Sequence, residues 1–280
     1  MIKKSIKLVA SLLVAVLTVT LTIGAVPAKA ATKQVEKTTT IQADITGDGK
    51  NDSIKFEFGG LQDGFATNLT VYVNDKKALS FNDLYFFAVG YDILSFDDGK
   101  PFLFLHLSEE NDDGPNGLYA YKSGKLKKVL DFNKSVSMCM YVNSLNVKGN
   151  KLTVGMGSSG IPGLGVSSFK AIYKYSNGKI KLASKTHKFT GYAGKKPGQI
   201  KVAYSFDIYS DKTCKKRIAT VPVGAKVKVT KIYVYGTKAS VYVESKDYKG
   251  WYRCYSYDKE PNLNVEGFCG TYFENTWMAG

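Results

Sequence analysis

A nine-residue hairpin pattern occurs twice in this chain and constrains the fold more than any other feature. The pattern Tyr-x-Tyr-x-x-Gly-Lys-x-Lys covers residues 119–127 and 173–181, a displacement of 54 at every position. Tyr at alternate positions followed by a Gly-containing turn is typical of two antiparallel strands joined by a tight turn. A looser copy begins at Val71, and the Asp-Gly-Lys loops at 48–50 and 98–100 are displaced by 50.

Strand patterning continues through most of the chain. Apolar and polar residues alternate in short runs, as at 53–58, 69–73 and 240–243, and no window has the spacing of an amphipathic helix. The 27 Gly fit a chain with many turns. We therefore predict an all-β fold. A period near fifty is typical of propeller blades, but three copies are fewer than the usual minimum of four, so a partial propeller-like array and a sandwich of hairpins are both expected possibilities.

The first thirty residues have the pattern of a secretory signal peptide. Residues 1–7 contain three Lys, residues 8–26 are mostly apolar, and residues 28–30 give the Ala-x-Ala site that a signal peptidase accepts. An uncleaved membrane anchor is the alternative, because the apolar run approaches the length of a bilayer span. We expect the protein to be secreted or associated with the cell wall. We expect it to be attached to a membrane only if this segment is not cleaved.

The chain is strongly basic, with a formal net charge of +15. Without residues 1–30 it keeps 35 basic and 24 acidic residues, a net charge of +11. An exported protein with this charge attracts polyanions, which in a bacterial envelope are wall polymers and lipid head groups. A solvated basic surface without a specific partner is the alternative. Nucleic acid is not expected, because Arg, the usual reader of bases and phosphates, occurs only at Arg217 and Arg253.

The sequence predicts two domains after the signal peptide. Residues 31–40 are expected to be a Lys- and Thr-rich linker, and residues 41–190 the hairpin-repeat domain. The Gly-rich stretch 191–199 breaks the strand pattern and is predicted to be a second linker. Residues 200–280 then form a smaller all-β unit with a C-terminal tail.

One loop has the composition of a calcium site. Ca²⁺ takes six to eight hard oxygen ligands, which requires a tightly coiled acidic loop. The stretch 44–52 places carboxylates at its first, fifth and ninth positions. The twelfth position is Lys55 instead of Glu, so the loop is not an EF-hand. The expected ligands are side chains and one backbone carbonyl, from Asp44, Thr46, Asp48, Lys50 and Asp52.

This loop resembles the D-x-D-G-D-G-x-x-D calcium loop that opens blades in β-propeller repeats of the FG-GAP and VCBS class. The resemblance implies a propeller-like domain with one structural Ca²⁺. Thr46 stands where such repeats usually have an acid. In the second copy Leu94, Phe96 and Phe102 replace the ligands, so that loop is expected to be metal-free. A turn closed by Asp side chains without metal is the alternative for the first loop.

The C-terminal unit carries a second resemblance. Residues 222–229 read Pro-x-Gly-x-x-Val-x-Val, a strand follows at 240–243, and Gly250-Trp251 comes after it. This order is similar to that of a bacterial SH3-like (SH3b) barrel over roughly residues 200–258, without that family's V-R-x-G-P opening. The resemblance implies a small SH3-like barrel that serves as a binding module, often for cell-wall peptide or glycan; it does not imply catalysis.

Aromatic side chains beside Lys residues are the candidate ligand-binding residues of this unit. Such surfaces suit sugars and short peptides, so the expected partner is a cell-wall polymer or a peptidoglycan peptide. For Trp251 a place in the barrel core is the alternative. The candidates are Tyr233, Tyr235, Tyr242, Tyr248, Trp251 and Tyr252.

Catalysis has little support, and we predict that the protein is not an enzyme. The two His residues, His106 and His187, exclude a three-His zinc site, and no G-x-S-x-G, H-E-x-x-H or P-loop pattern occurs. Two alternatives to a binding protein remain: an adhesin or protein-binding inhibitor, and a secreted cell-wall-acting hydrolase. The hydrolase would use the acidic loop with Glu109, Glu110, Asp112 and Asp113.

The four Cys residues permit two disulfides in an exported chain. Cys139 lies in an apolar run and is expected to be a buried thiol. One bridge is expected within the C-terminal trio, and the sequence does not select the pair: Cys214, Cys254 and Cys269.

Overall fold

The structure is a computed structural model that confirms the all-β class. Its described residues form twenty strands and one four-residue helix, α1 (Phe132–Ser135), and all neighbouring strands pair antiparallel in open sheets. No helix among these residues is long and apolar enough to cross a membrane. The predicted signal peptide, the acidic residues 110–113 and Cys269 lie outside the described residues, which are 31–34, 38–109, 114–137, 139, 141–161, 163–192, 195–236, 238–254 and 271–276.

A four-stranded antiparallel meander occurs three times before residue 190. The first contains β2 (Thr38–Ala43), β3 (Asp52–Gly59), β4 (Asn68–Val73) and β5 (Lys76–Phe81). The second contains β6 (Ala88–Ser95), β7 (Pro101–Ser108), β8 (Asn116–Lys122) and β9 (Lys125–Asp131). The third contains β10 (Tyr141–Lys148), β11 (Lys151–Ile161), β12 (Gly165–Ser176) and β13 (Lys179–Leu182). The period found in the sequence is therefore the period of a meander.

The same tight turn joins the third and fourth strands of each meander. The two turn residues have positive φ angles in all three copies: 49° and 60° at residues 74–75, 52° and 77° at 123–124, and 50° and 72° at 177–178. Two consecutive positive φ angles are the mark of a type I′ turn, whose twist matches that of the strands it joins. Asn, Asp, Ser and Gly at these positions explain why the hairpins form locally.

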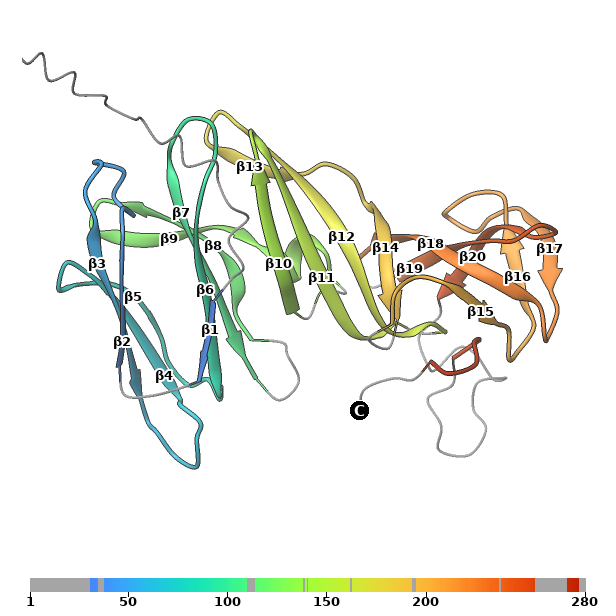
Figure 1. Ribbon diagram of the computed structural model, residues 1–280, viewed down its shortest axis with the longest axis horizontal. Coiled ribbons are helices and arrows are strands. Elements are labelled where there is room, and N and C mark those ends of the chain that lie inside the picture. The colour runs from blue at the N-terminus through green and yellow to red at the C-terminus, as the bar shows by residue number, and fades with distance from the viewer. Residues whose placement is uncertain are drawn as a thin grey trace, which may run out of the picture.

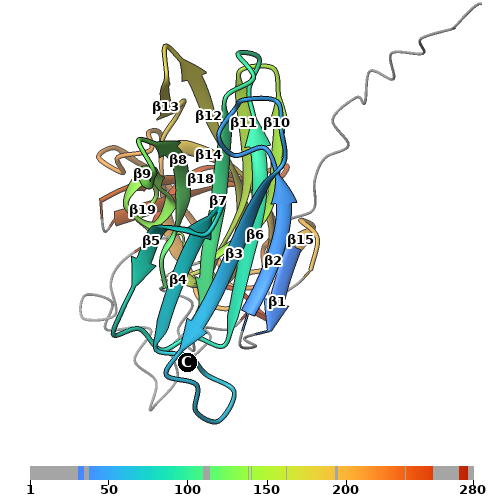
Figure 2. The ribbon, with the colours of Figure 1, turned by 90° about the vertical axis from the view of Figure 1, so that its left-hand side faces the viewer.

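The three meanders lie side by side as layers (Figure 1), and the first faces the viewer in Figure 2. The middle sheet packs Leu103, Leu105 and Leu107 against the first meander. It packs Phe102 and Phe104 on its other face, in the hydrophobic cluster that contains the third meander. Both faces of β7 are buried, and its residues 102–105 are all apolar, whereas apolar and polar residues alternate in the outer strand β3.

The middle sheet has a fifth strand at its edge. This strand is β1 (Ala31–Gln34), which pairs with β6. The segment 31–40, predicted to be a linker, therefore contributes β1 and the start of β2.

One continuous sheet joins the third meander to the C-terminal strands. Strand β14 (Thr186–Tyr192) pairs with β12 on one side and with β18 on the other, so the sheet crosses the predicted linker at 191–199. One hydrophobic cluster also extends through both parts. The C-terminal strands are β15 (Gln199–Lys201), β16 (Phe206–Tyr209), β17 (Arg217–Val221), β18 (Lys226–Tyr235), β19 (Lys238–Glu244) and β20 (Lys249–Cys254).

Residues 271–276 pack back onto the C-terminal strands. Isolated bridges pair Thr271 with Gly163 and Phe273 with Val202. The rings of Tyr272 and Phe273 lie 5.3 and 5.6 Å from the ring of Phe206. The tail therefore covers the end of the core.

Both histidines are buried. His106 is 7% exposed and His187 is 2% exposed, and no described group hydrogen-bonds to Nδ1 of His106 or Nε2 of His187. Burial lowers the pKa of each side chain to about 4. The folded protein therefore holds both rings neutral at pH values where an unfolded chain protonates them.

We expect the free energy of unfolding to fall as the pH is lowered from 6.5 to 4. In this window the unfolded chain, with an ordinary His pKa near 6.5, binds more protons than the folded protein. This difference lowers the free energy of unfolding by about 3 kcal/mol per histidine by pH 4. Urea unfolding at pH 7 and pH 4.5 measures the loss. His187→Phe, which keeps a ring against Phe169, should lose less stability over the same window, because one of the two titrating rings is removed. An unchanged pH dependence in this variant would contradict the assignment.

Candidate functional site

The open face of the C-terminal strands carries a row of aromatic and basic side chains. Directly opposed residues of antiparallel strands project on the same side of a sheet. Lys231 of β18 is opposite Tyr242 of β19, Tyr242 is opposite Trp251 of β20, and Trp251 is opposite Tyr209 of β16. In the next row Tyr233 is opposite Ser240, and Ser240 is opposite Arg253. We call this surface the aromatic–basic face and define it by Tyr209, Lys231, Tyr233, Tyr235, Tyr242, Trp251 and Arg253.

The strands present these side chains because their sequences alternate. In β19, Val241 and Val243 point into the core, and Tyr242 lies between them on the open side. In β20, Tyr252 points inward and the flanking Trp251 and Arg253 point outward. Because successive side chains of a strand point to opposite faces, neighbouring residues alternate between the core and the surface that a ligand can reach.

Each of four tyrosine rings on this face has a cation over it. Lys212 Nζ lies 4.6 Å from the centroid of Tyr233, and Lys231 Nζ lies 5.0 Å from that of Tyr242. Two further pairs are Lys185 with Tyr235, at 4.2 Å, and Arg253 with Tyr209, at 5.8 Å. Cations are attracted to the electron-rich ring faces. The face therefore presents ammonium and guanidinium groups held on aromatic rings, which suits anions better than it suits a sugar stacked on a bare ring.

The loop between β16 and β17 is fastened over this face. Ser240 Oγ donates to the carbonyl of Lys212 at 2.6 Å, and the guanidinium of Arg253 donates to the carbonyl of Cys214 at 2.6 Å. Asp211 accepts from the backbone N–H of Thr213 at 2.8 Å. These bonds fix the backbone from which the Lys212 side chain extends over Tyr233.

Two acidic side chains near the face, Asp207 and Glu244, lie beside cations. Asp207 forms an ion pair with Arg217 at 2.8 Å. Burial opposes ionisation of Asp207, but hydrogen bonds from Thr220 and Arg217 outweigh it and lower the pKa of the carboxyl. Glu244 is opposite both Lys228 and Lys249 in the strand register. The cations over Tyr233, Tyr235 and Tyr242 are Lys212, Lys185 and Lys231. Among the described residues none of these lysines forms an ion pair with a carboxylate.

The structure places four of the six predicted ligand-binding residues together on this face: Tyr233, Tyr235, Tyr242 and Trp251. Trp251 is partly exposed and packs edge-on against Tyr242 at 5.2 Å, outside the core. Tyr252 is 1% exposed and packs in the core against Phe206. Tyr248 lies in the β19–β20 turn, where its N–H bonds to Ser245 Oγ, and its side chain packs on the hydrophobic cluster.

Sequence reasoning missed Tyr209, Lys212, Lys185 and Arg253. The period of two that exposes Trp251 also exposes Arg253, so that residue had a local signal. Tyr209 had none, because its place beside Trp251 depends on the pairing of β16 with β20.

The predicted calcium loop joins β2 to β3 and is organised around backbone N–H groups. Asp44 accepts from the N–H groups of Gly47, Asp48 and Gly49 at 2.6, 3.2 and 2.8 Å. Asp52 is 4% exposed and accepts from the N–H groups of Ile45 and Thr46 and from the side chain of Asn74. Burial raises the pKa of the Asp52 carboxyl, but these hydrogen bonds outweigh burial and lower it overall.

The five predicted ligands thus share one loop, in which backbone N–H groups bind Asp44, Asp48 and Asp52. Among the described residues no group of three or more His, Cys, Asp or Glu side chains is arranged to hold a metal ion. Lys50 N–H bonds to Asp48 Oδ1 at 2.9 Å, and the equivalent loop repeats this turn with Lys100 N–H and Asp98 Oδ1 at 3.2 Å. The hydrogen-bonded turn is therefore common to both copies, and calcium at the first copy stays a prediction.

Cys139, Cys214 and Cys254 are buried free thiols in the structure. Burial raises the pKa of Cys139 to about 12, so this thiol is not a nucleophile near neutral pH. Cys254 belongs to the hydrophobic cluster with Tyr252, whereas the carbonyl of Cys214 is bound by Arg253, which projects from the opposite side of β20.

No family model, curated protein or solved structure matches this chain. The function is therefore inferred from the chemistry of the aromatic–basic face and of the loops around it.

We expect Asp52→Asn to destabilise the fold far more than Asp48→Asn. An amide oxygen at position 52 can replace only part of the charged acceptor for three N–H donors, and the cost of weakening buried bonds to a charged group is about 2–3 kcal/mol. Asp48 is exposed and accepts from Lys50 alone, so its loss should cost less than about 1 kcal/mol. Urea unfolding in the presence of EDTA compares the two variants without a metal contribution. Equal effects would show that the Asp52 bonds do not hold the loop.

Proposed function

We propose that this chain is an exported, non-catalytic binding protein that attaches to an anionic polymer of the bacterial cell envelope. The aromatic–basic face is the proposed attachment surface. The observation that carries the proposal is the set of four cations held over tyrosine rings on neighbouring strands. The predicted signal peptide and the net charge of +11 without it support the same compartment and the same sign of ligand.

A polymer fits this face better than a single small anion. The cations extend from Lys231 on β18 to Arg253 on β20 and to Lys212 in the β16–β17 loop, so successive anionic groups of one chain can each meet a cation. Contacts made by one polymer molecule reinforce each other through their high effective concentration. Rings that hold the ammonium groups in place also reduce the entropy lost when a ligand binds. Trp251, which is partly exposed, then offers apolar surface to the sugar part of a glycan.

The finer architecture belongs to the same proposal. The strand order β18-β19-β20-β16-β17 and the Pro-x-Gly-x-x-Val-x-Val segment support an SH3-like unit at the C-terminus. The three stacked meanders with a period near fifty support a propeller-like array.

The test is co-sedimentation of residues 31–280 with purified sacculi at low and high salt. The triple variant Lys185→Gln, Lys212→Gln, Lys231→Gln removes three of the cations over tyrosine rings. A loss of about 1 kcal/mol for each cation corresponds to on the order of a hundredfold weaker binding. The matched control replaces three exposed lysines of the first and second meanders, with the same change in charge: Lys76→Gln, Lys122→Gln and Lys127→Gln.

A control variant that still binds within about threefold of the unchanged protein supports the aromatic–basic face as the site. Equal losses in both triple variants would show that net charge alone drives association and would overturn the proposal. Removing the anionic polymers from the sacculi should abolish binding of the unchanged protein. Retained binding would identify peptidoglycan itself, including its peptides, as the ligand. Release of soluble wall fragments by the protein would favour a hydrolase.

We also propose that the loop 44–52 binds one structural Ca²⁺. Its carboxylates, the Thr46 hydroxyl and the Lys50 carbonyl are the hard oxygens that Ca²⁺ prefers. Binding requires Asp44 and Asp52 to exchange some of their N–H donors for the cation.

A ligand that binds only the folded state raises the melting temperature in proportion to the logarithm of its concentration. We expect CaCl₂ to raise the melting temperature of residues 31–280 by several degrees over EDTA, and Mg²⁺ at the same concentration to have a smaller effect. Asp48→Asn should remove most of the rise and leave the value in EDTA nearly unchanged. The same melting temperature in CaCl₂ and EDTA would overturn the calcium proposal. The loop would then be a metal-free turn held by hydrogen bonds.

A further inference from the structure

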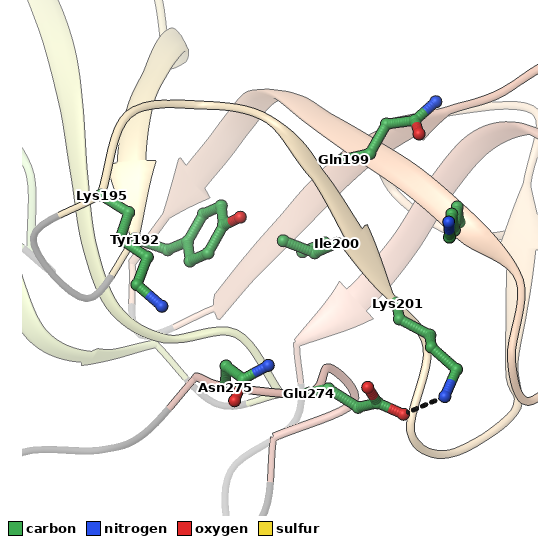
Figure 3. A pocket seen from close by; sticks show the side chains of 8 residues that line it. Tyr192, Lys195, Gln199, Ile200, Lys201, Glu274 and Asn275 are labelled. Carbon is green, nitrogen blue, oxygen red and sulfur yellow. Dashed lines mark ion pairs between the residues drawn. The ribbon is translucent and has the colours of Figure 1, made fainter.

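A cavity of about 400 Å³ lies where the 271–276 tail meets the junction of β14, β15 and β18. None of its lining residues belongs to the aromatic–basic face. In Figure 3 Tyr192 and Lys195 stand on one side, the Lys201–Glu274 pair stands on the other, and Ile200 lies between them. The volume is within the range of small-molecule sites.

The cavity has an excess of positive charge. Three lysines, Lys195, Lys201 and Lys226, line it together with one acid, Glu274. Glu274 is already engaged, because its carboxylate pairs with Lys201 at 2.7 Å and its N–H donates to the Lys201 carbonyl at 2.9 Å. Lys195 and Lys226 have no ion pair among the described residues. The lining therefore carries a net charge of +2.

The strand register places two of these lysines at directly opposed positions. Lys201 of β15 is directly opposite Lys226 of β18. Like charges at directly opposed positions destabilise an antiparallel pair. Glu274 offsets the charge of Lys201, and an anion in the cavity would offset the charge of Lys226, so the lining favours an anionic ligand on electrostatic grounds.

The remaining lining can orient a ligand with hydroxyl groups. The phenol of Tyr192 and the side-chain amides of Gln199 and Asn275 both donate and accept hydrogen bonds. Tyr192 is held in place, since its N–H and carbonyl bond to the carbonyl and N–H of Lys195 and its ring stacks on Phe189 at 6.3 Å. The buried Ile200 supplies an apolar wall. The site is thus preformed on the Tyr192 side and charged on the Lys201–Lys226 side.

We propose that this cavity binds a small phosphate monoester of a polyol or sugar, with the phosphate on the Lys201–Lys226 side and the hydroxyl groups toward Tyr192 and Lys195. A phosphate monoester carries close to two negative charges near pH 7, which balances the lining, whereas a carboxylate or a phosphodiester leaves one positive charge unmatched. Lysines bind phosphate as point charges and do not need the fork geometry of arginine. The phosphate has two possible sources, a soluble small molecule or the phosphate-bearing end of a wall polymer.

Isothermal titration of residues 31–280 with glycerol 3-phosphate at pH 7.5 tests the proposal. We expect one saturable site, and about tenfold weaker binding after Lys226→Gln, the loss typical of one charged hydrogen bond. Lys170→Gln, an exposed lysine on β12, should change the Kd less than twofold. Binding should weaken as the pH falls from 7.5 to 5.5, because the phosphate loses its second charge near pH 6.

Three results would overturn the proposal: no saturable binding, equal losses in the Lys170→Gln control, or equally tight binding of the methyl diester of glycerol phosphate. Inorganic phosphate with the same affinity would remove the role of Tyr192, Gln199 and Asn275. The triple variant Lys185→Gln, Lys212→Gln, Lys231→Gln should bind glycerol 3-phosphate normally, and a loss there would contradict two separate sites. If a phosphate-terminated polymer fragment competes with glycerol 3-phosphate, the wall polymer is the source of the phosphate. If it does not compete, the source is a soluble phosphate.

Discussion

The burial of both faces of the middle meander is the constraint on which the layered part of the structure depends. The meanders contact each other through β5 and β9, through β7 and β10, and through β9 and β13, so the middle one lies between the other two. Each fully buried Leu or Phe of β7 contributes about 1.5–3 kcal/mol relative to an exposed one. Without this sheet each outer meander would expose its inner apolar face to water. The three repeats are therefore three mutually dependent layers.

Apolar burial is non-directional, and polar contacts at the loop ends fix how the layers align. Asp97 accepts from Asn150 at 3.0 Å and Asp98 accepts from the Tyr175 hydroxyl at 2.5 Å, which ties the β6–β7 loop to the third meander. Lys125 donates to the carbonyl of Lys77 at 3.0 Å between the first two meanders. The second copy of the loop has Leu94, Phe96 and Phe102 at the positions of three ligands expected in the first, and it serves as an inter-layer contact.

Local patterns in the sequence were enough to predict the all-β class and the repeated hairpins, because alternation and turn residues act over a few positions. They could not show that β14 pairs with both β12 and β18, since pairing between distant strands leaves no local signal. The same limit applies to the site. Alternation exposes Tyr233, Tyr235, Tyr242 and Trp251, while the neighbouring Tyr252 turns into the core and Tyr209 arrives only through the strand register. Composition also could not decide whether Asp44 and Asp52 face a cation or N–H groups.

The continuous sheet carries both proposed anion sites of this basic chain. Strand β18 contributes Lys231 and Tyr233 to the aromatic–basic face and, near its other end, Lys226 to the cavity. On the open face the side chains are spread across neighbouring strands, a geometry that matches a long polymer. At the start of β18 the 271–276 tail contributes Glu274 and Asn275 to the lining of the cavity. The aromatic–basic face spreads its cations over several strands and loops, whereas the cavity gathers its lysines around about 400 Å³, so shape as well as charge would separate the two proposed ligands.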